Sequence, residues 1–332
     1  MEENIKDRRK WFTLYVKWSK RMIYTLTLNP ALDRTLIVEN LRFEDANRVK
    51  QELRYAGGKG IDVSRVINEL GSESIALGFV GGYDGMELEG RLINEGINCD
   101  FVKIAEETRI NVFIKKEKEG KRTSLHAKGP EISPSELATL YNKIKNLKPS
   151  PSWFIMSGSL PLGLSDNIYA QFTNLMRNKG IKVFLDSDGI PFKKGIKAIP
   201  FAIKPNLFEL ERLSGKKFKS RKEMITFGKK LVEKGIGFVL ISAAEKGILL
   251  ISKDTILKAT PPKVKVKSTI GAGDASVAGF IYAYEKKMSI SDCLRMAVSC
   301  GTATALTPGT ALCRKKDVKK IIKKCKVKEL EL

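Results

Sequence analysis

Residues 61–96 read IDVSRVINELGSESIALGFVGGYDGMELEGRLINEG, and this segment alternates between two kinds of hydrophobic pattern. Ile61–Leu70 carries apolar side chains at helical spacing and is followed by Gly71, which predicts an amphipathic helix. The apolar run Ile75–Val80 predicts a buried strand, and Asp84–Glu95 predicts a second helix that a glycine ends. Strands that alternate with helices in this way form crossovers in a mostly parallel sheet.

Most of the rest of the chain keeps this alternation. Ser133 with Glu136, and Ser220 with Glu223, have the spacing of capping boxes at helix starts. The predicted fold class is therefore α/β, a doubly wound, mostly parallel sheet with helices on both faces. The further predicted strands are Met22–Leu28, Trp153–Met156, Ile181–Leu185, Ala198–Ile203 and a hairpin of Phe238–Ile241 with Ile248–Ile251. The further predicted helices are one from Ser133, Ser165–Lys179, a short one from Asn206, one from Ser220 to Gly235, Asp274–Lys287 and Ser291–Leu306.

Two stretches break the alternation, because they hold strand-like segments with no helix between them. Glu119-Gly120 supplies a hairpin turn for the last pair of these segments. Four strands inserted into a parallel-sheet domain predict a small sheet that stands off the main body, over about residues 34–56 and 109–127. Such an appendage is placed to act as a lid. The four segments are Thr35–Val38, Val49–Arg54, Asn111–Lys116 and Lys121–His126.

Composition places the chain among globular proteins. Its 332 residues are 42% hydrophobic, which excludes a mini-protein, a disordered tail and a fibre. The 60 Lys and Arg exceed the 37 Asp and Glu, for a net charge of +23, of which +4 lies in residues 1–21 and +6 in residues 314–332. The chain has no zinc-knuckle spacing and no aromatic run typical of RNA binding. We therefore expect no specific nucleic-acid partner.

The termini and cysteines give further expectations. Met22 is a natural chain start, so we expect residues 1–21 to be an extension or a mobile arm, and residues 326–332 to be a tail. No apolar run reaches the roughly 18 residues that span a bilayer, and Trp11–Val16 is too short for a signal peptide. The five cysteines have no metal-binding spacing. We expect reduced thiols, a cytoplasmic protein and no membrane partner.

A glycine-rich segment carries the chemistry. Ser268–Asp274 reads STIGAGD directly before an apolar helix, so backbone N–H groups can converge on a phosphoryl group at the positive helix end. A positioned Asp there can take the proton of an attacking hydroxyl. In the alternative interpretation, Asp274 caps the helix and the glycines form a turn. The chain has no Walker A loop and no G-x-G-x-x-G after a strand.

Six motifs in order resemble those of the PfkB/ribokinase family of carbohydrate kinases, over residues 22–325. Within that family they resemble the phosphofructokinase and tagatose-6-phosphate kinase branch. The motifs are Asn29-Pro30-Ala31-Leu32-Asp33, Gly57-Gly58-Lys59-Gly60-Ile61, Gly81-Gly82, Ser157-Gly158-Ser159-Leu160-Pro161, Lys204-Pro205-Asn206 with Glu209, and Gly271-Ala272-Gly273-Asp274.

The resemblance implies a role for each matching residue. Asp274 would be the base, with Gly271, Ala272 and Gly273 as the anion hole. Asp33 would accept hydrogen bonds from sugar hydroxyls. The other residues expected to bind the substrate are Gly57, Gly58, Lys59, Asp62, Arg109, Arg48 and Ser157, with Lys59 and the two arginines at the substrate's phosphate. Arg48 is equally well explained as a solvated surface charge.

The resemblance also implies ATP and Mg²⁺. Asn206 and Glu209 lie one helical turn apart and would orient Mg²⁺ around the ATP phosphates, with Glu209 holding the metal through water. The nucleotide would lie against Lys204, Ser242 and Gly247.

Other residues depart from the family pattern or stand outside it. Asp62 stands where the branch usually has Asn, Ala244 replaces a glycine of the nucleotide loop, and Ala275 replaces a small hydroxyl residue. The single His126 is interpreted as structural. Asp186 and Asp188 follow a predicted central strand, where α/β folds bind ligands, and the sequence assigns them no role.

The implied activity is ATP-dependent phosphorylation of a ketohexose monophosphate to a bisphosphate. Fructose 1-phosphate ranks first as acceptor, fructose 6-phosphate second and tagatose 6-phosphate third. The alternatives are another sugar or nucleoside kinase of the family, and a non-catalytic protein that binds sugar phosphate or nucleic acid. The resemblance further implies a homodimer through the outer face of the lid sheet.

Overall fold

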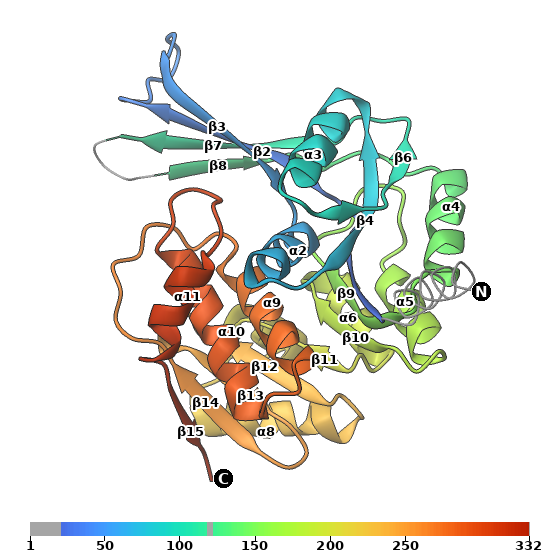
Figure 1. Cartoon of the computed structure of the whole chain (residues 1–332), viewed down its shortest axis with the longest axis vertical. Coiled ribbons are helices and arrows are strands. Elements are labelled where there is room, and N and C mark those ends of the chain that lie inside the picture. The colour runs from blue at the N-terminus through green and yellow to red at the C-terminus, as the bar shows by residue number, and fades with distance from the viewer. Residues whose placement is uncertain (1–20, 118–121, 332) are drawn as a thin grey trace, which may run out of the picture.

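The computed structural model describes residues 21–117 and 122–331, and its main sheet runs through the body of the molecule (Figure 1). Apolar runs that lie buried on both faces form its parallel strands, as expected for a covered sheet. Their order is β12 (Phe238–Ser242), β11 (Ala202–Ile203), β10 (Lys182–Asp186), β9 (Pro151–Ser157), β1 (Met22–Thr27) and β4 (Ser74–Gly81), with β5 (Asn98–Cys99) and β6 (Val102–Ile104) both paired to β4.

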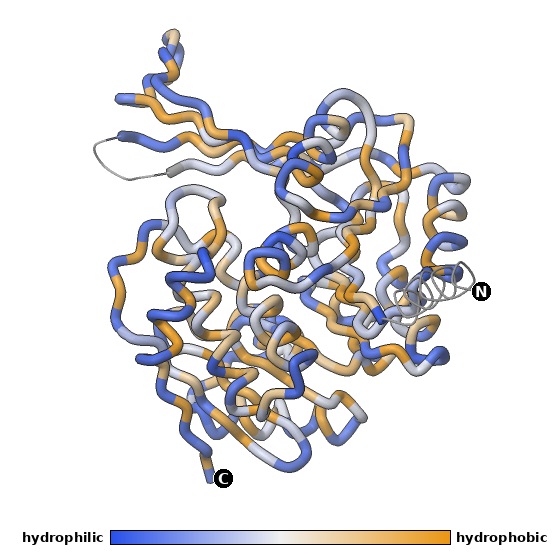
Figure 2. Tube along the Cα trace, in the orientation of Figure 1, coloured by the Kyte–Doolittle hydropathy of each residue, from blue (hydrophilic) through white to orange (hydrophobic). Residues whose placement is uncertain are grey.

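Helices cover both faces of this sheet, as predicted. Successive strand residues enter different cores: Ile23 packs in one and Tyr24 in the other. One core includes residues of α2 (Lys59–Leu70), α9 (Ala272–Glu285), α10 (Ile290–Ala305) and α11 (Lys315–Ile322). The other includes residues of α4 (Pro134–Lys145), α5 (Ile168–Arg177), α6 (Gly189–Lys197), α7 (Leu207–Ser214) and α8 (Arg221–Glu233), while α3 (Gly82–Asn94) packs near β4 in a third cluster. Figure 2 shows apolar residues along the strands and polar ones over much of α4 and α11.

A second sheet stands off the main body (Figure 1), as the four inserted segments predicted. Its order is β3 (Val49–Gly57), β2 (Ala31–Val38), β7 (Arg109–Lys116) and β8 (Arg122–His126). Strands β2 and β7 are parallel, and their register sets Asp33 beside Asn111. The turn expected at Glu119-Gly120 lies outside the described residues. His126 contacts Phe113 edge-on, with ring centroids 5.6 Å apart, which agrees with its structural interpretation.

The structure corrects several predicted elements. Of the strand expected over Ala198–Ile203, only Ala202–Ile203 pairs, and the unpredicted α6 precedes it. The sequence of α6 contains Gly189, Pro191 and Gly195, which weaken its helical signal. The helix expected from Ser165 begins at Ile168.

The C-terminal residues expected as a tail include a strand. β13 (Ile248–Ile251) pairs antiparallel with β12 as predicted, followed by β14 (Ile256–Thr260) and then β15 (Lys326–Glu329) at the sheet edge. The sequence of β15 is KVKE, and none of its side chains is fully buried, so it carries no hydrophobic signal.

One of the two capping boxes is confirmed. Ser133 and Glu136 exchange both capping bonds at the start of α4. Ser220 accepts from the N–H of Glu223, but the Glu223 carboxylate accepts from the N–H of Lys219 instead of closing the box. No helix within residues 21–117 and 122–331 is long and apolar enough to cross a membrane.

Candidate active site

The expected site residues gather where the parallel strands end. Ser157 ends β9, Asp186 ends β10, Lys204 follows β11 and Ser242 ends β12. The carboxyl ends of parallel strands lie at one edge of a sheet, and this edge is where α/β folds bind ligands.

A buried carboxylate joins two of the lysines at this edge. Asp186 is 1% exposed, and its Oδ1 and Oδ2 lie 3.6 Å from Lys59 Nζ and 3.1 Å from Lys204 Nζ. Burial alone would raise the pKa of Asp186, but the two lysines hold it below its usual value. The pKa of Lys59 is raised, chiefly by Asp186. Asp186 therefore fixes two cations beside the site, a role that the sequence did not assign.

The glycine-rich turn before α9 leaves two backbone donors free. Gly271 has φ 73°, in the left-handed region that favours glycine, and its carbonyl accepts from the N–H of Ala275 at 2.8 Å. The N–H groups of Gly273 and Asp274 have no acceptor in the described part of the chain. A Cβ on Gly273 would lie 3.2 Å from Lys204 Nζ. Free N–H groups, the helix dipole and a lysine thus meet at one point that suits an anion.

Asp274 is buried beside these donors. Its side chain belongs to the first turn of α9, and the residue is 8% exposed. The pKa of Asp274 is raised to about 6, chiefly by burial; Asp186 and Glu209 act in the same direction, and Lys59 and Lys204 oppose the shift. A carboxylate with a pKa near neutrality can both take and release a proton at physiological pH.

A second buried carboxylate lies at the base of the second sheet. Asp33 of β2 is 6% exposed, and its Oδ1 accepts from Asn111 Nδ2 at 2.9 Å. Burial raises the pKa of Asp33 to about 6, against the effects of Asn111, Arg109 and Arg65. A Cβ on Gly57 would lie 2.5 Å from Asp33 Oδ2, so the glycine lets the strand approach this carboxylate.

Gly58 and Ser157 lie nearer the middle of the sheet edge. Gly58 precedes α2 with φ 130°, and a Cβ there would lie 2.7 Å from a methyl of Thr27. Ser157 is fully buried, and its hydroxyl has no hydrogen-bond partner among the described residues. An unpartnered buried hydroxyl remains available to a bound ligand.

The two arginines expected at a substrate phosphate have different surroundings. Arg109 donates to the carbonyls of Asn29 and Ala127, each at 2.8 Å, and its charge acts on Asp33. Arg48 is exposed just before β3, at the end opposite Gly57. Because a strand rises about 3.4 Å per residue, Arg48 lies roughly 30 Å from Gly57 along β3. Within one chain the structure does not bring Arg48 to the site, because β3 carries it to the distal end of the second sheet.

Asn206 and Glu209 form a capping box at the start of α7. Asn206 Oδ1 accepts from the N–H of Glu209 at 2.9 Å, and Glu209 Oε2 accepts from the N–H of Asn206 at 2.8 Å. Glu209 is 7% exposed, and its charge acts on Asp274 and Lys59. The pair therefore holds a helix start, and it also sets a carboxylate close to the lysines.

The β12–β13 turn lies next to this helix start. The N–H of Ser242 donates to the Pro205 carbonyl at 3.0 Å, and Gly247 has φ 87°. Ala244 has φ 44°, so alanine occupies a backbone conformation that favours glycine. Ala275 is fully buried in α9.

Sequence reasoning missed Asn111, Arg65 and the function of Asp186. The position of Asn111 depends on the register of β2 with β7, which no local pattern fixes. Asp188, the neighbour considered with Asp186, is exposed, caps α6 and pairs with Arg212 at 2.6 Å.

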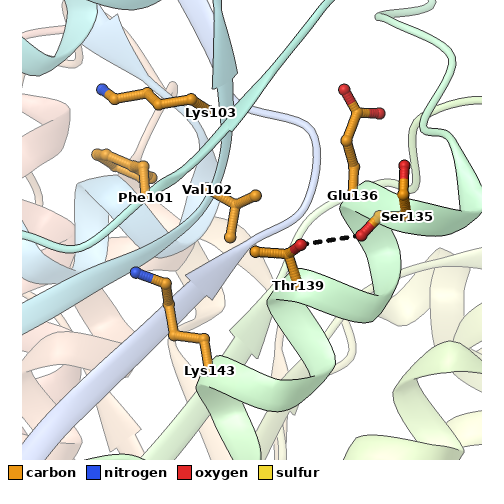
Figure 3. A pocket seen from close by; sticks show the side chains of 7 residues that line it. All are labelled: Phe101, Val102, Lys103, Ser135, Glu136, Thr139 and Lys143. Atoms are coloured by element: carbon orange, nitrogen blue, oxygen red, sulfur yellow. Dashed lines mark hydrogen bonds between the residues drawn. The ribbon is translucent and has the colours of Figure 1, made fainter.

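A pocket of about 380 Å³ lies elsewhere, between β6 and α4 (Figure 3). Its two lysines are already paired, Lys103 with Glu89 and Lys143 with Asp100. The residues that line this pocket include none of those expected at the site; they are Phe101, Val102, Lys103, Ser135, Glu136, Thr139 and Lys143.

Comparison with known proteins identifies relatives over nearly the whole chain. Residues 26–317 match the pfkB family carbohydrate kinase model. A 1-phosphofructokinase of Borreliella burgdorferi is 41% identical over 93% of this chain and 99% of the relative, and a D-tagatose-1-phosphate kinase of Bacillus licheniformis is 38% identical over 87% and 94%. The crystal structure of phosphofructokinase-2 from Escherichia coli in complex with potassium aligns with a TM-score of 0.88 and 28% identity, covering 92% of this chain and 99% of that one.

Proposed function

This chain belongs to the pfkB family of carbohydrate kinases, and from that premise we propose that it transfers the γ-phosphoryl group of ATP to a ketohexose monophosphate. Fructose 1-phosphate is the proposed acceptor, and fructose 1,6-bisphosphate the product. The observation that carries the proposal is the buried Asp274 beside two free N–H groups and a lysine. Two relatives bear the names of kinases for ketohexose 1-phosphates, which supports this acceptor over fructose 6-phosphate and tagatose 6-phosphate.

In the proposed reaction Asp274 is the base. Its carboxylate takes the proton of the sugar hydroxyl while that oxygen bonds to the γ-phosphorus, and the bond to the β–γ bridging oxygen breaks to release ADP. The free N–H groups of Gly273 and Asp274, at the Gly271–Ala272–Gly273 turn, would hold the oxygens of the transferred group. Lys59 and Lys204, fixed by Asp186, would offset the charge that develops there.

The acceptor would bind between the base of the lid and α2. Asp33 would accept hydrogen bonds from sugar hydroxyls, with Asn111 holding its carboxylate in place. Gly57 and Gly58 would let the backbone approach the sugar, and Ser157 would offer its unpartnered hydroxyl. Lys59 and Arg109 would meet the phosphate already on the substrate.

The nucleotide would bind at the ends of β11 and β12. Lys204, Asn206, Ser242 and Gly247 would contact ATP, and Glu209 would hold Mg²⁺ through water. In the described residues no group of three His, Cys, Asp or Glu side chains could hold a metal, which suits an ion held mainly by water and phosphates. When bound, Mg²⁺ would neutralise phosphate charge.

We further propose that residues 22–325 form the kinase domain, with β15 completing its sheet, and that two copies pair through the lid. One lid face holds Asp33, Thr35 and Asn111, all buried. The opposite face carries a stripe of half-buried or exposed apolar side chains, which a second copy would cover; they are Leu36, Val112, Ile114 and Leu125.

The test is ADP production from MgATP with four acceptors in parallel: the 1-phosphates and 6-phosphates of fructose and tagatose. The proposal predicts the highest kcat/KM with fructose 1-phosphate. Comparable turnover with a 6-phosphate would reassign the acceptor. Absence of turnover with all four, in folded protein that binds ATP, would contradict the kinase proposal and favour a sugar-phosphate binding protein.

A further inference from the structure

Three buried carboxylates converge at the proposed acceptor site from three elements. Asp33 comes from β2, Asp62 from α2 and Asp274 from α9, and they are 6%, 7% and 8% exposed. Asp62 lies close to the glycine-rich turn, because a Cβ on Gly271 would be 3.8 Å from Asp62 Oδ2. The charges of Asp33 and Asp274 both act on Asp62. Three like charges in one buried site oppose one another unless cations or protons compensate them.

The cation next to Asp62 is shared with another carboxylate. Arg65, one helical turn along α2, lies with Nη1 3.2 Å from Asp62 Oδ1 and Nε 2.7 Å from Glu95 Oε2. Its guanidinium also donates to the Ala56 carbonyl at 3.4 Å and lies over the Tyr55 ring. Arg65 is the only ion-pair partner of Asp62 within the described residues, and Glu95 neutralises part of its charge. Asp33 and Asp274 face Asp62 from β2 and α9.

We propose that Asp62 is a substrate-positioning residue that works as a neutral carboxylic acid, and that its proton helps the site to accept an anionic sugar phosphate. Burial raises the pKa of Asp62 well above its usual value, Asp274 and Asp33 raise it further, and Arg65 opposes them. The proton removes one of the three negative charges and turns an acceptor oxygen into an O–H donor. This inference rests on the proposed function, because a phosphorylated acceptor brings further negative charge to the same place.

Infrared difference spectra between wild type and Asp62→Asn test the protonation directly. Near pH 7.5, where Asp33 and Asp274 are mostly ionised, wild type should show the C=O stretch of a protonated carboxyl that the variant lacks. A wild-type spectrum without that band would overturn the proposal whatever the kinetics.

The KM for the sugar phosphate, measured from about pH 6 to about pH 9, tests the consequence. Loss of the proton should raise the wild-type KM by up to about tenfold per pH unit above the pKa of Asp62, while D62N shows no such rise. The D62N profile also corrects for ionisation of the substrate's own phosphate. A rise in KM of equal size in wild type and D62N would contradict the proposal. If the KM of both proteins stays constant up to about pH 9 and the infrared band is present, Asp62 keeps its proton over the whole pH range.

Glu95→Gln is a second variant, which keeps Asp62 but should favour its ionised form. Without the Glu95 charge, Arg65 acts more strongly on Asp62 and lowers its pKa, so the band and the low KM should both be lost at a lower pH than in wild type. This variant keeps the test open if D62N does not fold. If the proposed function itself is wrong, the result will differ from all of these outcomes: wild type and both variants would lack turnover and would not bind the sugar phosphate.

Discussion

Asp274 gives the reaction a predicted dependence on pH. Burial raises its pKa to about 6, so Asp274 keeps its proton at pH values where an exposed aspartate has lost it. A base must be ionised, so kcat/KM should be full well above pH 6 and should fall about tenfold or more per unit as pH drops below about 6. The measurement is kcat/KM against pH, which reports the pKa values of the unliganded enzyme. A kcat/KM that stays constant down to about pH 4.5 would contradict the role of this carboxylate.

The positive φ of Ala244 leads to a prediction about the stability of the protein. Its φ of 44° is in the left-handed region, which costs a non-glycine residue about 1–2 kcal/mol. Ala244→Gly removes this strain but adds freedom to the unfolded chain, so we expect a net stabilisation of about 0.5 kcal/mol in denaturant unfolding.

Gly247→Ala is the matched comparison in the same turn. Gly247 has φ 87°, and an added Cβ would lie 1.9 Å from the Ala259 carbonyl, so this change should destabilise the protein by more than about 2 kcal/mol. A destabilising Ala244→Gly, or a neutral Gly247→Ala, would refute this description of the turn.

The close approach of β3 to β2, at Gly57 and Asp33, leads to a prediction about substrate binding. Gly57→Ala places a methyl group 2.5 Å from Asp33 Oδ2. The φ of Gly57 is not positive, so alanine adds no backbone strain there. Any change in substrate binding therefore comes from the clash between this methyl group and the Asp33 carboxylate. We expect the KM for the sugar phosphate to rise at least about tenfold, with little change in the KM for ATP, because Asp33 must move.

Gly90→Ala is the control for this substitution. Gly90 is within α3, and an added Cβ would meet nothing within 4 Å. Alanine there should stabilise the helix by about 0.5–1 kcal/mol without changing either KM. If Gly57→Ala behaved in the same way, the proposed acceptor site at Asp33 would be wrong.

The elements also mark what the sequence could predict. α2, β4 and α3 have strong periodicity and glycine ends, so their positions were predictable. α6 and β15 were not, because glycine and proline obscure the first and exposure on both faces obscures the second. In the site, residues within ordered motifs were predictable, whereas Asn111 and the pairing of Asp186 with two lysines depend on strand register and on contacts between distant segments.

The proposed pairing of two whole molecules through the apolar face of the lid sheet can be tested by substitution. Leu125 is 55% exposed on β8 and lies beside Val112, so Leu125→Glu puts a charge into the proposed interface without disturbing the core. We expect the dimer dissociation constant to rise at least about tenfold in sedimentation experiments. Ile190→Glu, at a 59% exposed position of α6, is the control. Equal dimerisation of both variants would exclude pairing through this face.

The role of Asp274 as the base is tested by the rate of ADP release by Asp274→Asn with fructose 1-phosphate and saturating MgATP, measured beside Asp254→Asn as an exposed control. The asparagine keeps the size of the side chain but cannot take the proton, so kcat should fall about 10²–10⁴-fold while ATP still binds. The control should turn over at the wild-type rate. A wild-type kcat in Asp274→Asn would contradict the assignment of Asp274 as the base, because the proton of the sugar hydroxyl would then have another acceptor.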